Sequence, residues 1–63
     1  MEDIDMLYDY YKDNNLAAGG YAVVACRVKD DRLEKRFTEL TQMVLSDSRE
    51  TARLIIKLGG QIF

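Results

Sequence analysis

Apolar residues recur at intervals of three and four along almost the whole chain, in two runs. The first run consists of Ile4, Leu7, Tyr11, Asn14, Ala18, Tyr21, Ala25 and Val28, and the second of Leu33, Phe37, Leu40, Val44, Asp47, Thr51, Leu54 and Leu58. This period of about 3.5 residues is typical of helices that pack side by side. Because the chain contains no proline, each run can form one long helix. The sequence predicts an all-α fold with two helices over roughly residues 3–28 and 31–58.

The expected helix ends carry recognisable signals. Asp31 and Glu34 have the spacing of a capping box, which favours a helix start within the stretch VKDDRLE. Gly59 and Gly60 favour the end of the second helix, because glycine readily adopts the left-handed conformation that closes helices. The acidic residues within positions 2–5 suit the positive end of the first helix dipole.

The connection between the two runs is only a few residues long, which makes the neighbouring helices antiparallel. Both helices rise equally per residue, so with a turn near residues 29–30, residues whose numbers sum to about 60 lie at one level. This rule pairs Leu7 with Leu54, Asn14 with Asp47 and Tyr21 with Leu40. Residues 1–26 carry five acids and one base, whereas residues 27–63 carry eight bases and six acids. The acidic start of the first helix is therefore expected beside Arg49, Arg53 and Lys57.

A chain of 63 residues forms one domain, 1–63, and buries too little surface to be more than marginally stable alone. Cys26 is the only cysteine and is expected to be a small buried side chain, so no disulfide can form within the chain. Because histidine is also absent, a tetrahedral zinc site is excluded. Apolar residues off the two runs need a second hairpin to cover them: Tyr8, Tyr10, Val24, Met43, Ile55 and Ile56. The simplest product is a homodimeric four-helix bundle.

Polar residues interrupt both runs, at Asn14, Asp47 and Thr51. One interpretation is a polar layer that fixes the register and the oligomeric state of the bundle. A second is a metal site, because Asp47 and Glu50 have the one-turn spacing of carboxylate ligands in di-iron and di-manganese bundles and would occur twice in a dimer. A third is that Asp47 or Glu50 simply points to water. The missing histidine ligands favour the polar layer.

Two adjacent glycines, Gly19 and Gly20, fall in the middle of the first predicted helix. They cost roughly 1 kcal/mol each relative to alanine, so close approach of a neighbouring helix is the favoured reason for them. A kink or a gap that contacts a ligand are the alternatives. Tyr11 and Tyr21 are expected at the helix–helix interface, where each hydroxyl finds a partner.

The stretch from Ala22 to Gly60 resembles a ferritin-like half-bundle. Asp31, Leu33, Phe37, Leu40 and the closing Leu58-Gly59-Gly60 fit that frame. In length and pattern the chain is most similar to small spore coat protein F-like proteins, and the resemblance implies a four-helix bundle and a coat role. Where metal-binding members carry Glu-x-x-His, this chain has Asp47-Ser48-Arg49-Glu50. It ends in GGQIF, where Phe63 could pack on the bundle, rather than in an aromatic Gly-Trp-Tyr-like tail.

Charge and hydropathy exclude several functional classes. A net charge of −2 argues against a nucleic-acid partner, which needs a basic surface. No signal peptide and no membrane-spanning run are visible, so the expected location is the cytoplasm, or the spore coat. The sequence predicts a non-enzymatic, cofactor-free assembly protein that pairs with itself. The alternatives are a degenerate metal-binding bundle that uses Asp47 and Glu50, and an adaptor that offers Tyr10 and Ile56 to an unidentified protein.

Overall fold

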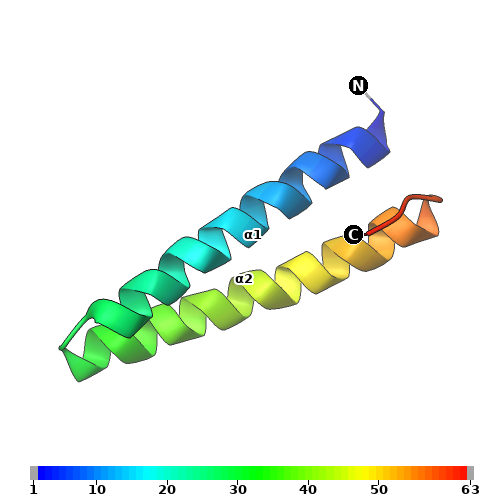
Figure 1. The fold of residues 1–63 in the computed structure, drawn as a ribbon. Coiled ribbons are helices and arrows are strands. Elements are labelled where there is room, and N and C mark those ends of the chain that lie inside the picture. The colour runs from blue at the N-terminus through cyan, green and yellow to red at the C-terminus, as the bar shows by residue number, and fades with distance from the viewer. Residues whose placement is uncertain (1, 63) are drawn as a thin grey trace.

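The computed structural model describes residues 2–62 as a hairpin of two helices (Figure 1). Helix α1 spans Asp3–Arg27 and helix α2 spans Asp31–Lys57. The helices run antiparallel and pack against each other. This confirms the all-α hairpin, with helix ends within one residue of the predicted positions. Phe63, which the sequence predicts to pack on the bundle, lies outside the described residues.

Helix α2 begins with a cap one residue earlier than the sequence predicts. Oδ1 of Asp30 accepts hydrogen bonds from the backbone N–H groups of Arg32 (2.8 Å) and Leu33 (3.0 Å). Asp31, the predicted cap, is the first helical residue. Asp30 takes the role because its extended backbone, with φ −80° and ψ 121°, aims the carboxylate at N–H groups that have no partner within the helix.

Helix α2 ends as the glycine pair predicts, in a Schellman motif. The Gly59 N–H donates to the Ile56 carbonyl at 3.0 Å, and the Gly60 N–H donates to the Ile55 carbonyl at 2.9 Å. Gly59 has a φ of 92°, a conformation that costs a residue with a Cβ atom roughly 1–2 kcal/mol. The chain therefore leaves the helix axis at this point.

The face of α2 that packs on α1 differs from the predicted face along the second half of the helix. The buried residues of α2 are Ser48, Thr51 and Ile55, and Ile55 exposes 0% of its surface. The sequence predicts Asp47 and Leu54 at the interface and Ile55 outside it, but Asp47 is exposed and Leu54 is 42% exposed. The cause is geometric, because a straight helix repeats every 3.6 residues and drifts by about 20° per heptad from a 3.5-residue stripe.

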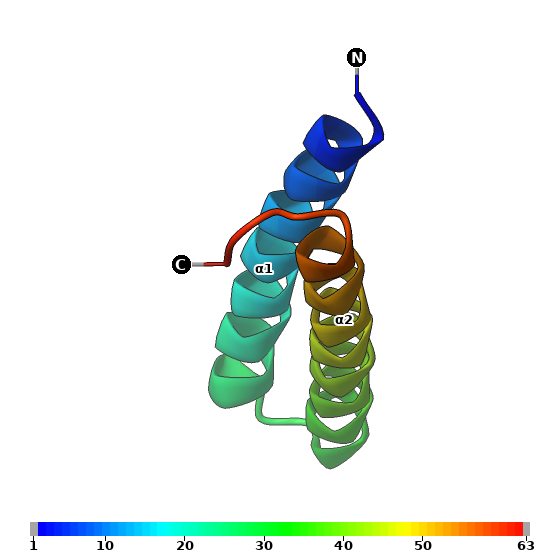
Figure 2. The same ribbon diagram turned by 90° about the vertical axis from the view of Figure 1, so that its right-hand side faces the viewer.

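The residues after α2 fold back across α1, as Figure 2 shows. The Tyr8 hydroxyl donates a hydrogen bond to the Gln61 carbonyl at 3.0 Å and accepts one from the Gln61 N–H at 2.8 Å. Gly60 packs so closely that a Cβ atom there would lie 2.6 Å from Ile55 Cγ2 and from the Tyr8 hydroxyl. The tail thus ties the open end of α2 to α1.

The hairpin is long and thin, with extents of 43 × 18 × 16 Å. Its radius of gyration is 13.9 Å, whereas a compact domain of this length has about 11 Å. Among residues 2–62, Ala18 and Ile55 are the buried apolar residues. No helix in this range combines the length and the apolar character needed to cross a bilayer.

Two adjacent isoleucines test this packing. Ile55→Ala should lower the free energy of unfolding by about 2–5 kcal/mol, because the side chain is fully buried and a cavity replaces it. Ile56→Ala is the matched control and should change it little, since Ile56 is 59% exposed. Thermal and urea unfolding followed by circular dichroism measures both. Equal losses of unfolding free energy in the two variants would contradict the burial of Ile55 and the exposure of Ile56.

Candidate functional site

A polar cluster of Tyr10, Asn14 and Asp47 joins the two helices on one side of the hairpin. The Tyr10 hydroxyl donates a hydrogen bond to Oδ2 of Asp47, and Nδ2 of Asn14 donates to the same oxygen at 3.2 Å. This contact confirms the predicted pairing of Asn14 with Asp47. Tyr10 is 47% exposed, Asp47 is exposed and Asn14 is half-buried, so the cluster lies at the surface.

The buried polar residues between the helices are not the predicted set. Thr51 is 4% exposed as expected, but its hydroxyl donates to the Asp47 carbonyl of its own helix at 2.9 Å. Ser48 is also 4% exposed, and its hydroxyl has no hydrogen-bond partner. The cross-helix hydrogen bonds therefore form at the exposed Asp47, while the buried Ser48 and Thr51 mainly supply small side chains.

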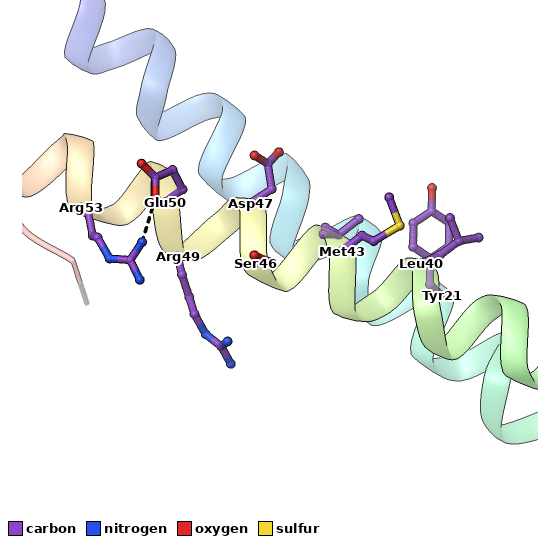
Figure 3. Close-up of a pocket in the computed structure, with 9 residues that line it drawn as sticks. Tyr21, Leu40, Met43, Ser46, Asp47, Arg49, Glu50 and Arg53 are labelled. Atoms are coloured by element: carbon purple, nitrogen blue, oxygen red, sulfur yellow. Dashed lines mark hydrogen bonds and ion pairs between the residues drawn. The ribbon is translucent and has the colours of Figure 1, made fainter.

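The two carboxylates proposed as metal ligands are each engaged with other groups. Asp47 accepts the hydrogen bonds of the cluster, and Glu50 pairs with Arg53 at 2.8 Å. Figure 3 shows Asp47 and Glu50 on one side of α2, with Arg49 pointing away from them. Within residues 2–62, no three acidic or thiol side chains come close enough together to hold a metal ion. A site shared between two chains stays a prediction.

The predicted attraction between the acidic start of α1 and the basic end of α2 does not produce ion pairs. The ion pairs among the described residues lie within α2, between Arg36 and Glu39 at 3.8 Å and between Arg53 and Glu50 at 2.8 Å. All four side chains are at least 48% exposed, so solvent screens both pairs and each contributes little to stability. The hairpin is held by packing, by the polar cluster and by the tail.

A shallow hollow lies beside the cluster and extends along α2 from Leu40 to Arg53. Its apolar part is lined by Tyr21, Leu40, Met43 and Val44 (Figure 3). The ring of Tyr21 packs on Phe37, with 6.1 Å between centroids and 57° between planes. Tyr21 thus reaches α2 at the level that the sequence predicts. The hollow is open to solvent and is part of a surface, not an enclosed ligand cavity.

The glycine pair does not approach α2. A Cβ atom built on Gly19 or Gly20 would meet nothing within 4 Å, and both residues are exposed. Helix α1 continues through both without a break. Close approach within the hairpin is thus not observed, and close approach to a second chain stays a prediction. Tyr11 is half-buried, as expected for an interface residue. Cys26 is exposed, although the sequence predicts a buried side chain.

Comparisons with models of protein families, with curated proteins and with solved structures find no match to this chain. The ferritin-like and spore-coat resemblance therefore rests on the sequence pattern alone. The side-chain interactions observed among the described residues are hydrogen bonds, ion pairs within α2 and apolar contacts, and histidine is absent from the chain.

A double-mutant cycle measures what the cluster contributes. Tyr10→Phe and Asp47→Ala should each lower the free energy of unfolding by about 1 kcal/mol, and the double variant should lose less than the sum because both remove one hydrogen bond. Glu50→Ala is the matched control and should cost under about 0.5 kcal/mol, since it removes an exposed pair within one helix. Strict additivity in urea unfolding would show that the bond contributes nothing.

Glycine substitutions test the space around each site. Gly19→Ala should raise the free energy of unfolding by about 1 kcal/mol, because alanine favours the helix and the added methyl group meets open space. Gly60→Ala should lower it by about 1–3 kcal/mol, because its Cβ atom would overlap Tyr8 and Ile55. Thermal unfolding compares the two. A loss of stability in Gly19→Ala would reveal a neighbour of α1 at this position.

Proposed function

We propose that this chain is a non-enzymatic self-association module, which forms a homodimeric four-helix bundle. The observation that carries the proposal is the amount of surface that the single hairpin leaves uncovered. The chain exposes 5044 Å² to solvent. A compact monomer of 7.3 kDa exposes roughly 4,200 Å². The difference, roughly 850 Å², is close to the area of about 800 Å² that each partner buries in a typical stable interface.

The uncovered surface is rich in large apolar side chains. They are Met6, Tyr10, Leu16, Val23, Leu33, Met43, Leu45, Leu54, Ile56 and Leu58, with exposures between 39% and 70%. Monomeric proteins rarely keep extended apolar surface of this kind, which usually marks a contact with another chain. A second hairpin would give each helix a second neighbour and would supply the second layer that a stable helical core needs.

A dimeric bundle is also the shape that the ferritin-like resemblance implies, and an assembly role suits a coat protein. Both the coat role and the cytoplasmic location stay predictions from the sequence. The adaptor interpretation uses the same apolar surface, but it assigns the surface to a different protein. The two interpretations differ in what the purified chain does alone.

Sedimentation equilibrium and native mass spectrometry of the purified protein test the proposal. The expected result is a species of twice the 7.3 kDa chain mass at micromolar concentration, because the uncovered area matches that of a stable dimer. Adding manganese or iron should leave this mass unchanged. A stable monomer at these concentrations would overturn the proposal and favour the adaptor interpretation. A dimer that carries bound metal would instead support the two-chain site of Asp47 and Glu50.

A further inference from the structure

The start of α1 and the start of α2 are held in different ways. Asp30, at the N-cap of α2, accepts hydrogen bonds from two backbone N–H groups of its helix. Glu2, at the N-cap of α1, makes no side-chain capping bond among residues 2–62. A helix without this bond keeps an unpaired backbone N–H group and is less stable at its start. The first turns of α1 therefore take more of their stability from contacts with other parts of the chain.

The tail after α2 supplies contacts of this kind, where it crosses α1 (Figure 2). Tyr8, in the second turn of α1, donates a hydrogen bond to the Gln61 carbonyl at 3.0 Å and accepts one from the Gln61 N–H at 2.8 Å. A Cβ atom on Gly60 would lie 2.9 Å from Ile4 Cδ1 and 2.6 Å from the Tyr8 hydroxyl oxygen. The Gly60 backbone therefore packs directly against the first two turns of α1.

The tail is held mainly through its main chain. The N–H and the carbonyl of Gln61 both engage Tyr8, while Gln61 itself is exposed. Gly59 turns the chain away from the axis of α2 with a φ of 92°, and Gly60 leaves no room for a Cβ atom. Ile62 is half-buried in a hollow beside Tyr8. The position of the tail thus depends on two glycines and one hydroxyl group, and not on the side chain of Gln61.

The same tail contacts cover Ile55, which exposes 0% of its surface. The Gly60 N–H donates to the Ile55 carbonyl at 2.9 Å, and a Cβ atom on Gly60 would lie 2.6 Å from Ile55 Cγ2. Release of the tail would therefore uncover Ile55, break both hydrogen bonds of Tyr8 and remove the neighbour of Ile4 in one event. Contacts that are lost together define a cooperative opening unit.

The polar cluster lies outside this unit and keeps the helices paired beyond it. Tyr10 and Asn14 both donate hydrogen bonds to Asp47 on α2, and these bonds do not involve the tail. Closer to the turn, the ring of Tyr21 packs on Phe37 with 6.1 Å between centroids. The rest of the hairpin therefore has its own contacts between α1 and α2 when the tail is released.

We infer that residues 3–8 and 59–62 form a clasp, the end clasp, which opens and closes as one unit while the rest of the hairpin stays folded. Closed, the end clasp completes the start of α1 and covers Ile55. Open, it frees the first turns of α1 and exposes Ile55. The end clasp is thus a conformational device that controls access to a fully buried side chain. Both halves belong to one chain, so the inference goes beyond the proposed function and does not rest on self-association.

Hydrogen exchange of single backbone amides, followed by NMR in the full chain, tests whether the end clasp is a unit. The amides of Leu7, Tyr8 and Gln61 should show one common opening constant, because a single event releases them. The Ala18 amide lies beyond the polar cluster and should be protected at least about tenfold more strongly. Unprotected Leu7 and Tyr8 amides beside a protected Gln61 amide would overturn the inference.

Two pairs of variants test the coupling between the tail and α1. Gly60→Ala should speed exchange of the amides of residues 7 and 8 by about tenfold, because the added Cβ atom overlaps Tyr8 and releases the tail. Gln61→Ala is the matched control and should leave these rates unchanged, since Tyr8 contacts only the main chain of residue 61. Tyr8→Phe should act like Gly60→Ala, and Tyr11→Phe should act like Gln61→Ala, because the Tyr8 hydroxyl is the one that bonds to the tail.

Two outcomes would overturn the end clasp. If Gly60→Ala and Tyr8→Phe leave the amides of residues 7 and 8 unchanged, the tail does not hold the start of α1. If both variants speed exchange equally along all of α1 and α2, opening is global and the end clasp is not a separate unit. Neither outcome bears on the proposed function, which is read from the mass of the protein in solution.

Discussion

The interface between α1 and α2 is the packing on which the hairpin depends, and the tail contact at Tyr8 forms only because this interface brings the end of α2 beside α1. Each helix packs on one neighbour only, so the interface buries few residues completely, and Ala18, Ser48 and Thr51 among them are small. Small side chains let the helix backbones approach, and the fully buried Ile55 closes the open end where the tail folds over. Because the core contains few residues, the hydrogen bonds of the Asp30 cap and of the Schellman motif add local stabilisation at the two ends of α2.

The sequence predicts the secondary structure of this chain well because local rules decide it. Both helices come from runs without proline that begin with acidic residues, and a glycine pair closes the second of them. The level pairing of Asn14 with Asp47 also follows from sequence, since antiparallel helices with a short turn have only one register. The pattern does not predict the rotation of α2 about its own axis, which decides the side that packs on α1. Asp47 and Ser48 differ by 100° around the helix, so a small error in the assumed period exchanges an exposed carboxylate for a buried hydroxyl.

Contacts between residues far apart in the chain are the part that sequence rules miss. Tyr8 lies off the predicted stripe, and no local signal indicates that its hydroxyl both donates to and accepts from Gln61. The glycines show the same limit. Gly19 and Gly60 look alike in sequence, but only Gly60 lies where a Cβ atom would overlap its neighbours. The folded hairpin determines which glycine is required by packing, and the local sequence around each glycine does not distinguish the two.

The polar cluster lies beside the apolar part of the hollow, which Leu40, Met43 and Val44 line, and this placement has an energetic consequence. The hydrogen bonds from Tyr10 and Asn14 to Asp47 fix the relative position of α1 and α2 in the isolated chain. A surface formed by two helices that are already aligned loses less conformational entropy when it binds than one whose helices must first be brought into register. The cluster therefore sets the register of the two helices within the single chain. A polar group at the edge of an apolar surface thus stabilises the hairpin modestly and keeps the two helices that form this surface in one register.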